Sequence, residues 1–120
     1  MKTVILGAST NPHRYAYQAA GRLSQKGLSF VPIGIKKGEV FGEPILDLRS
    51  KPMIEDVHTI TMYMNAVHQN EWIDYILSLK PKRIIFNHGA ENVKLENAAK
   101  EQGIHVENAC TLVMLSLGSY

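Results

Sequence analysis

The stretch "VILGASTNPHRYAYQAAGRL", residues 4–23, combines an apolar run, a turn rich in Ser, Thr, Asn and Pro, and an amphipathic segment. An uninterrupted apolar run is typical of a strand buried on both faces of a parallel sheet. The later residues with small apolar side chains recur at helical spacing, which allows close packing on a sheet: Ala16, Ala19, Ala20 and Leu23. Gly27 is placed to end that helix. The stretch therefore predicts a strand, a loop at its carboxyl end and a helix.

The same alternation continues along the chain. Apolar runs predict strands at residues 3–8, 29–34, 56–64, 82–89 and 104–109. Amphipathic spacing predicts further helices at residues 70–80, 92–103 and 110–118. Between them, the turn-rich residues 35–52 contain a short extended piece at Pro44–Leu46, followed by one helical turn.

Alternating strands and helices indicate a parallel sheet with right-handed crossovers. The predicted fold is a Rossmann-like, doubly wound α/β domain with a mainly parallel sheet between two helical layers. If Pro44–Leu46 is an edge strand beside 29–34, the strand order is 3-2-1-4-5-6. Ligands of such sheets bind at the carboxyl ends of the strands, where the order reverses. The loops 7–15, 34–42 and 62–66 therefore form the predicted site, with 87–92 next to them.

Composition narrows the class of protein. The chain has 120 residues, 45% of them hydrophobic and 20% charged, which predicts a single globular domain over residues 1–120. No apolar run approaches the roughly 20 residues of a membrane span, so no membrane association is expected. A formal net charge of +2 without a basic block argues against nucleic acid and leaves room for a local anion site. The single cysteine, Cys110, fits a reducing cytoplasm.

The first loop has the features of a phosphate site. Gly7 permits a sharp exit from the strand, and Asn11-Pro12 predicts the start of the helix. The exposed N–H groups of the first helical turn, with the hydroxyls of Ser9 and Thr10, form a surface of hydrogen-bond donors. Arg14 in the first helical turn is disfavoured by the helix dipole unless an anion binds there; a solvent-facing arginine is the alternative.

The second loop is cationic. In dinucleotide-binding domains the second strand normally ends in an acid that holds a ribose, whereas this chain has Lys36 and Lys37 and no acid before Glu39. The first loop also lacks the GxGxxG pattern. A lysine pair suits a ribose that carries a phosphate, although a solvated pair in a surface turn is the commoner case. An NAD(P) or other nucleotide site, in an enzyme or not, remains an alternative.

Several stretches together resemble the small CoA-binding-domain family and, more distantly, the amino-terminal domain of the succinyl-CoA synthetase alpha subunit. The resemblance covers essentially the whole chain. It rests on "GAS" followed by an arginine, "VP", "KKGEVFGEPIL", "LKPKRIIFNHGAEN" and "ENACTLVML". Asn87-His88-Gly89 departs from the Asn-Pro-Gly of relatives, which puts the shape of that loop in doubt.

The resemblance implies a CoA or acyl-CoA ligand, with its diphosphate on Ser9, Thr10 and Arg14 and a phosphate on Lys37. Tyr63 and Met64 then line the adenine or pantetheine path. The synthetase uses a phosphohistidine from a separate region that these residues do not supply, so binding without self-contained catalysis is expected. The full predicted set is Gly7, Ala8, Ser9, Thr10, Arg14, Lys36, Lys37, Tyr63 and Met64.

Other reactive residues leave alternatives open. Cys110 is either a nucleophile beside a thiol cofactor or a small buried residue, and His88 beside Glu91 is the histidine placed for acid–base work. No histidine spacing indicates a metal site. The apolar tail "LVMLSLGSY" fits a homodimer interface or the protein's own sheet. An oligomeric scaffold or regulator with a vestigial site is the remaining alternative.

Overall fold

The computed structural model describes residues 1–120 as alternating strands and helices. The strands are β1 (Lys2–Leu6), β2 (Phe30–Gly34), β3 (Glu39–Val40), β4 (Glu43–Pro44), β5 (Leu46–Asp47), β6 (Val57–Met62), β7 (Arg83–Phe86) and β8 (His105–Asn108). The helices are α1 (Tyr15–Gln25), α2 (Ala66–Gln69), α3 (Ile73–Ser78), α4 (Val93–Glu101) and α5 (Thr111–Leu117), with 3₁₀ turns η1 (Leu48–Ser50) and η2 (Asn70–Trp72).

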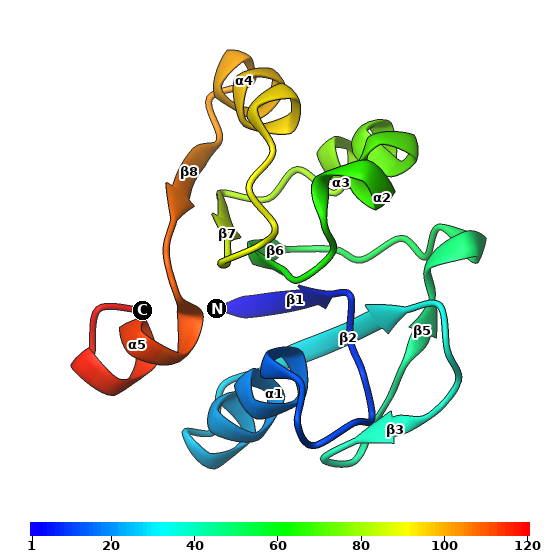
Figure 1. Ribbon diagram of the computed structural model, residues 1–120, viewed down its shortest axis with the longest axis vertical. Coiled ribbons are helices and arrows are strands. Elements are labelled where there is room, and N and C mark those ends of the chain that lie inside the picture. Colours follow the sequence, from blue (N-terminus) through cyan, green and yellow to red (C-terminus); the bar gives the residue numbers. More distant parts are fainter.

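The main sheet has the order β5-β2-β1-β6-β7-β8, and each pair of neighbours is parallel (Figure 1). With β5 counted as the third strand of this sheet, the order is the predicted 3-2-1-4-5-6. The prediction of a Rossmann-like doubly wound sheet is confirmed. The order reverses between β1 and β6, which is the predicted switch point.

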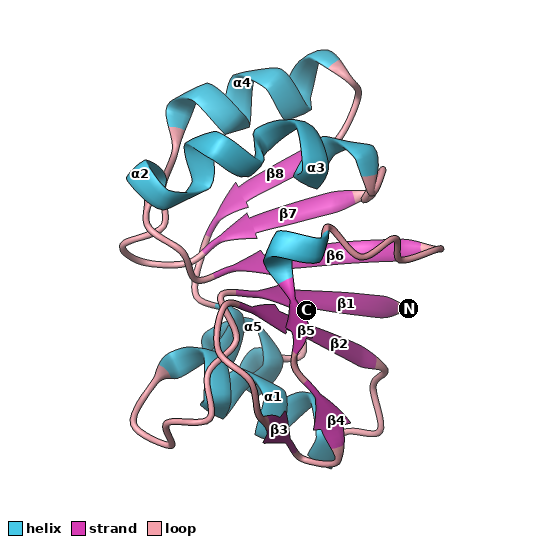
Figure 2. Ribbon diagram, turned by 90° about the vertical axis from the view of Figure 1, so that its right-hand side faces the viewer, coloured by secondary structure: helices cyan, strands magenta, loops and turns pink.

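Helices cover both faces of the sheet (Figure 2). Helices α2, α3 and α4 lie on one face over a cluster that includes Val4, Ile60 and Ile84. Helices α1 and α5 lie on the other face, where Ile5 packs with Ala16, Ala20 and Leu115. The predicted small-residue face of α1 is buried as expected: Ala16, Ala19, Ala20 and Leu23.

The edge strand differs slightly from the prediction. It is Leu46–Asp47 rather than Pro44–Leu46, because Glu43–Pro44 pairs instead with Glu39–Val40 in a small antiparallel hairpin. A backbone hydrogen bond of 2.8 Å from Ile45 N to Gly38 O closes the base of this hairpin. The hairpin carries the second loop and stands outside the main sheet.

The helix predicted at 70–80 is divided into α2, η2 and α3. It begins earlier because the side chain of Asn65 caps α2 by accepting a hydrogen bond of 3.0 Å from His68 N. The buried side chain of Gln69 donates to Met64 O at 2.6 Å and to Ala90 O at 2.7 Å, which ties the start of this segment to the carboxyl edge of the sheet.

The carboxyl-terminal tail packs on its own sheet. Tyr120 joins the cluster beneath α1, its hydroxyl bonds that of Thr3 at 2.5 Å, and the guanidinium of Arg83 lies 4.7 Å from its ring centre. The tail thus contacts the protein's own sheet through Tyr120, while its Val113 and Leu117 are exposed. None of the helices has the length and hydropathy that crossing a bilayer requires.

Candidate functional site

The carboxyl ends of the strands form one continuous edge. At each step, a backbone N–H just beyond one strand donates to the last or next-to-last carbonyl of its neighbour. These bonds are Gly7 N to Ile33 O (2.9 Å), Tyr63 N to Leu6 O (2.9 Å), Asn87 N to Met62 O (3.3 Å) and Ala109 N to Phe86 O (3.1 Å). The loops after β2, β1, β6, β7 and β8 therefore leave the sheet side by side.

Close approaches between glycines and neighbouring loops hold the switch point together. A Cβ at Gly34 would lie 2.8 Å from Ala8 O, and one at Gly38 would collide with the methyl group of Thr10. The second loop is thus pressed against the first. On the other side, a Cβ at Gly7 (φ +97°) would lie 3.1 Å from Met64 N.

The first loop has fewer free donors than its sequence suggests. The N–H groups of Gly7 and Ala8 both donate to Ile33 O, at 2.9 and 3.0 Å, because β2 ends directly beside them. Ser9 Oγ accepts a hydrogen bond of 3.0 Å from Asn11 N. The backbone N–H groups of Ser9 and Thr10 make no hydrogen bond within the chain, so they are free donors of this loop.

The predicted helix start at Asn11-Pro12 is wrong. Asn11 Oδ1 accepts from His13 N at 3.0 Å and Asn11 O accepts from Arg14 N at 3.0 Å, so these residues form a turn of their own. Helix α1 begins at Tyr15, and Arg14 is its N-cap residue rather than a member of its first turn. The first three N–H groups of α1 are free within the chain, and the exposed Arg14 stands at that end.

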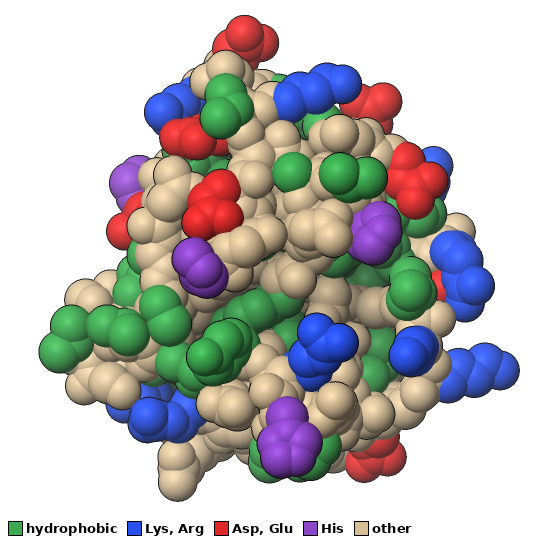
Figure 3. Space-filling view, viewed as in Figure 1, with side chains coloured by type: hydrophobic (Ala, Val, Ile, Leu, Met, Phe, Trp, Pro, Cys, Tyr) green, Lys and Arg blue, Asp and Glu red, His purple; other side chains and the backbone are tan.

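The second loop places exposed cations beside these donors. Lys36 and Lys37 are exposed, and like Arg14 they make no ion pair within the chain. Figure 3 shows Lys and Arg side chains over the β1–α1 and β2–β3 connections. The charge arrangement suits an anion bound between the two loops.

Sequence reasoning missed Asp47 and Arg49 beside this loop. Asp47 is the register partner of Gly34, so its carboxylate lies at the end of β2, and Arg49 Nε contacts its Oδ1 at 3.0 Å. Hydrogen bonds from Arg49 and the charges of Arg49 and Lys37 lower the pKa of Asp47. The spacing Asp47-x-Arg49 gave little signal, because the pairing of β5 with β2 creates this neighbourhood.

Tyr63 and Met64 lie where β6 leaves the sheet. Met64 faces Gly7, whereas Tyr63 packs into the cluster beneath α1. The Tyr63 hydroxyl is buried, makes no hydrogen bond within the structure and lies beside Thr61 and Thr111, whose hydroxyls bond each other at 2.8 Å. Burial raises the pKa of Tyr63 to about 12. The backbone of Tyr63 and the side chain of Met64 therefore lie against the first loop at Gly7, while the tyrosine ring packs beneath α1.

A hollow lies further along the same edge, beyond β7 and β8. Its volume is about 240 Å³, and it is lined by Phe86, His88, Glu91, Asn108, Ala109 and Cys110. Cys110 is exposed, so the interpretation of a small buried residue is wrong: the loop after β8 turns it outward. His88 Nδ1 lies 3.9 Å from Glu91 Oε2, and the His88 side chain is fully exposed.

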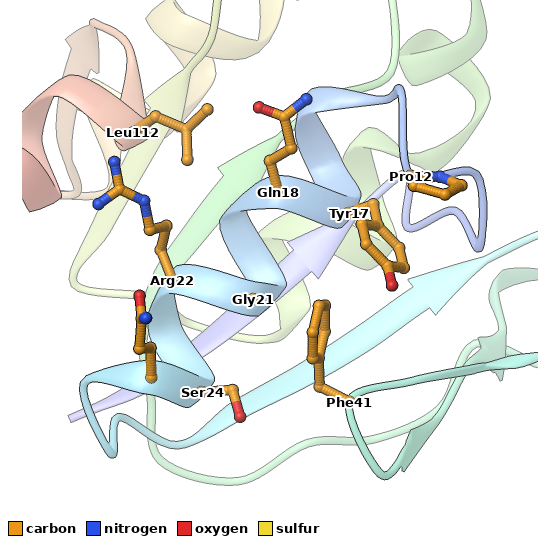
Figure 4. Close-up of a pocket in the computed structure, with 9 residues that line it drawn as sticks. Pro12, Tyr17, Gln18, Gly21, Arg22, Ser24, Phe41 and Leu112 are labelled. Carbon is orange, nitrogen blue, oxygen red and sulfur yellow. The ribbon is translucent and has the colours of Figure 1, made fainter.

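Another hollow, of about 560 Å³, lies on the outer side of α1, between that helix, the hairpin tip and α5. Figure 4 shows Tyr17 and Phe41 facing each other beside Gly21, with Arg22 and Leu112 on the far side. The two aromatic ring centres are 4.9 Å apart. The packing of Phe41 on Tyr17 and Gly21 holds the hairpin on α1. This hollow is separate from the carboxyl edge of the sheet.

The strand order and the two helical layers define a Rossmann-like α/β domain, and comparison with known proteins gives the family. Residues 1–116 match the model of the CoA binding domain, and the chain belongs to that family.

Solved structures agree with this fold. A structure described as an uncharacterized protein shares 52% identity over 99% of this chain and 97% of its own, with a TM-score of 0.95. Cell-free ID.343 from Thermus thermophilus shares 24% identity over 99% of this chain and 90% of its own, with a TM-score of 0.85. A PH1109 protein redesigned for binding shares 19% identity over 99% and 84%, with a TM-score of 0.86. No curated protein matches the sequence.

Proposed function

We propose that this protein binds CoA or an acyl-CoA along the carboxyl edge of its sheet, as one 120-residue unit in the cytoplasm, without turnover chemistry of its own. Family membership supports CoA as the ligand. The observation that carries the placement is the contact of Gly38 with Thr10, because it brings a lysine loop and a set of free backbone donors together.

In this proposal the diphosphate lies at Ser9, Thr10 and the start of α1, close to Arg14. Free N–H groups at a helix start bind phosphate oxygens, and the helix dipole favours the charge. The 3′-phosphate of the adenosine lies at Lys36 and Lys37. Asp47, a carboxylate close enough to feel the charge of Lys37, is held by Arg49. This makes it a poor acceptor for a free ribose and favours a phosphorylated one over NAD.

Thermal shift with CoA, dephospho-CoA, NAD and NADP tests the ligand, because a ligand that binds only the native state raises the midpoint by mass action. We expect the largest shift with CoA and a smaller one with dephospho-CoA, which lacks the 3′-phosphate. Equal shifts with NAD contradict the preference for CoA. No shift with any of the four compounds contradicts the proposal and favours the scaffold.

Variants at the cations test the placement. Lys37→Ala and Arg14→Ala each remove a charged donor and are expected to weaken CoA binding by about tenfold, with an unchanged midpoint of the free protein. Lys94→Ala is the matched control, since Lys94 is exposed on α4. A lower midpoint of the free variants shows instead that Arg14 or Lys37 stabilises the fold.

A further inference from the structure

The carboxyl edge that we propose for CoA continues from the first loop to the hollow at Cys110. From β1, the order along the sheet is β6, β7 and β8, and each step is joined by a backbone hydrogen bond. With about 4.8 Å between neighbouring strands, the distance from the end of β1 to the end of β8 is about 14 Å. None of the residues proposed to bind the phosphates of CoA lies on this part of the edge.

The pantetheine arm of CoA has a matching length. Its backbone from the diphosphate oxygen to the sulfur is as long as about four extended residues, or roughly 14 Å. The adenosine phosphate lies toward the second loop in the proposed mode, so the arm leaves the diphosphate in the opposite direction, over β6 and β7. Its thiol end then arrives at the hollow lined by His88, Glu91 and Cys110.

That hollow is lined by a thiol, an imidazole and a carboxylate. The Cys110 thiol is exposed and free, and the imidazole of His88 borders the same space with the carboxylate of Glu91 3.9 Å from its Nδ1. Thiols exchange with disulfides whenever a thiolate reaches the sulfur, so a cysteine at the end of a bound pantetheine arm is placed for this reaction.

We propose that Cys110 exchanges with a disulfide of CoA bound on the edge and so holds one CoA covalently as a mixed disulfide; this rests on the proposed CoA binding. The Cys110 thiol gives its proton to His88, and the Sγ thiolate attacks the CoA-linked sulfur of the disulfide. The Sγ–S bond to CoA forms as the old S–S bond breaks. The departing thiolate takes the proton from His88. One disulfide is exchanged for another, so no further oxidant is needed.

The experiment compares two disulfides, CoA disulfide and pantethine, by mass spectrometry of the intact protein under non-reducing conditions. Both present the same pantetheine sulfur, but pantethine lacks the nucleotides. We expect one CoA per chain, formed at least about tenfold faster from CoA disulfide than the pantetheine adduct from pantethine, because binding raises the local concentration of the sulfur. Cys110→Ser is expected to form neither adduct.

Lys37→Ala separates guided exchange from simple thiol reactivity. It is expected to slow the reaction with CoA disulfide toward the pantethine rate and to leave the pantethine rate unchanged, whereas His88→Gln slows both. Equal rates for the two disulfides in the unaltered protein overturn the inference, and so does an adduct that persists in Cys110→Ser.

Thermal shift of Cys110→Ser with CoA distinguishes this failure from failure of the proposed function. If CoA stabilises that variant while the two rates are equal, CoA binding stands and the guided exchange is refuted. If CoA stabilises neither protein and the rates are equal, both proposals fall.

Discussion

At the scale of single residues, Tyr63 shows how a polar group can be buried without a partner. Its hydroxyl lies next to those of Thr61 and Thr111, but these two bond each other at 2.8 Å, and Asn87 Nδ2 donates to Thr61 Oγ1 at 2.8 Å. Thr61 Oγ1 is therefore engaged by both Thr111 and Asn87 rather than by Tyr63. A buried hydroxyl without a hydrogen bond costs about 1–3 kcal/mol.

Tyr63→Phe is therefore expected to stabilise the protein by about 1 kcal/mol, which raises the melting midpoint by about 4 °C. The high-pH behaviour changes too. Burial holds the pKa of Tyr63 at about 12, against 10.0 for an ordinary tyrosine, so its protonated form stabilises the fold below pH 10 and this contribution is lost as the pH rises through 12. The variant should lose less stability in this range.

Melting curves from pH 7 to about 11 measure both effects. Tyr75→Phe is the comparison, because Tyr75 also has a pKa raised to about 12 but donates a hydrogen bond of 2.6 Å to Pro52 O. Tyr75→Phe removes an existing hydrogen bond and should destabilise the protein. A drop in midpoint for Tyr63→Phe would show that its hydroxyl is hydrogen-bonded after all.

At the scale of elements, the hairpin β3–β4 brings the lysine loop to the first loop. Its contact with the first loop is Gly38 against the methyl group of Thr10, and its contact with α1 is Phe41 against Gly21, where a Cβ would lie 2.9 Å from the end of the ring. The two contacts lie at opposite ends of the hairpin. Together they fix the position of Lys36 and Lys37 relative to α1.

Gly38→Ala is expected to push the two loops apart and to weaken CoA binding by about tenfold, because the new Cβ collides with the Thr10 methyl group. Thr10→Ser removes that methyl group and keeps the hydroxyl. The double variant should therefore recover part of the lost affinity, with a coupling of about 1 kcal/mol between the two sites. Calorimetric titration of CoA into the unaltered protein, the two single variants and the double variant measures this coupling energy. Additive effects of the two substitutions contradict the loop contact.

Phe41→Ala is expected to destabilise the protein by about 1 kcal/mol, since the half-exposed ring loses its packing on Tyr17. Phe41 also has φ +48° in a two-residue turn, a conformation that asparagine tolerates better than alanine. Phe41→Asn should therefore melt above Phe41→Ala and below the unaltered protein. Leu117→Ala, which changes an exposed leucine on α5, is the control. Equal midpoints for both Phe41 variants contradict strain at the turn.

Much of this organisation was predictable from local patterns. The buried strands appear in the sequence as apolar runs and α1 as a row of small residues, so a parallel sheet covered by helices follows from the alternation. The strand order needed the further assumption of an edge strand beside β2. The start of α1 was not predictable in this way, because an asparagine can cap either a helix or a turn. In the structure Asn11 caps a turn, where its Oδ1 accepts a hydrogen bond from His13 N. The exposure of Cys110 and the pairing of Asp47 with Arg49 depend on how distant strands meet. Residue spacing does not encode such neighbours.

At the scale of the whole molecule, the carboxyl edge works as one unit because its steps are bonded to one another. Asn87 is the central side chain of this edge. Its Nδ2 donates to Thr61 Oγ1 at 2.8 Å and to Met62 O at 3.0 Å, and its Oδ1 accepts from Thr111 N at 2.9 Å. It thus joins the end of β6 to the start of α5, next to the residue that we propose as the nucleophile.

Asn87→Ala tests whether the edge depends on this side chain. The substitution leaves the buried N–H of Thr111 and the carbonyl of Met62 without that partner, and each such loss costs about 1–3 kcal/mol. We expect a loss of about 3 kcal/mol in stability, and a midpoint lower by about 10 °C. Asn97→Ala, at an exposed position of α4, should change the midpoint little.

The same substitution, Asn87→Ala, should also affect the exchange reaction, because Thr111 follows Cys110 directly and loses its hydrogen bond to Asn87 Oδ1. At a temperature where the variant is folded, we expect a smaller ratio between the rates with CoA disulfide and with pantethine. A variant that keeps both its midpoint and that ratio would show that the backbone bonds alone hold the edge in place.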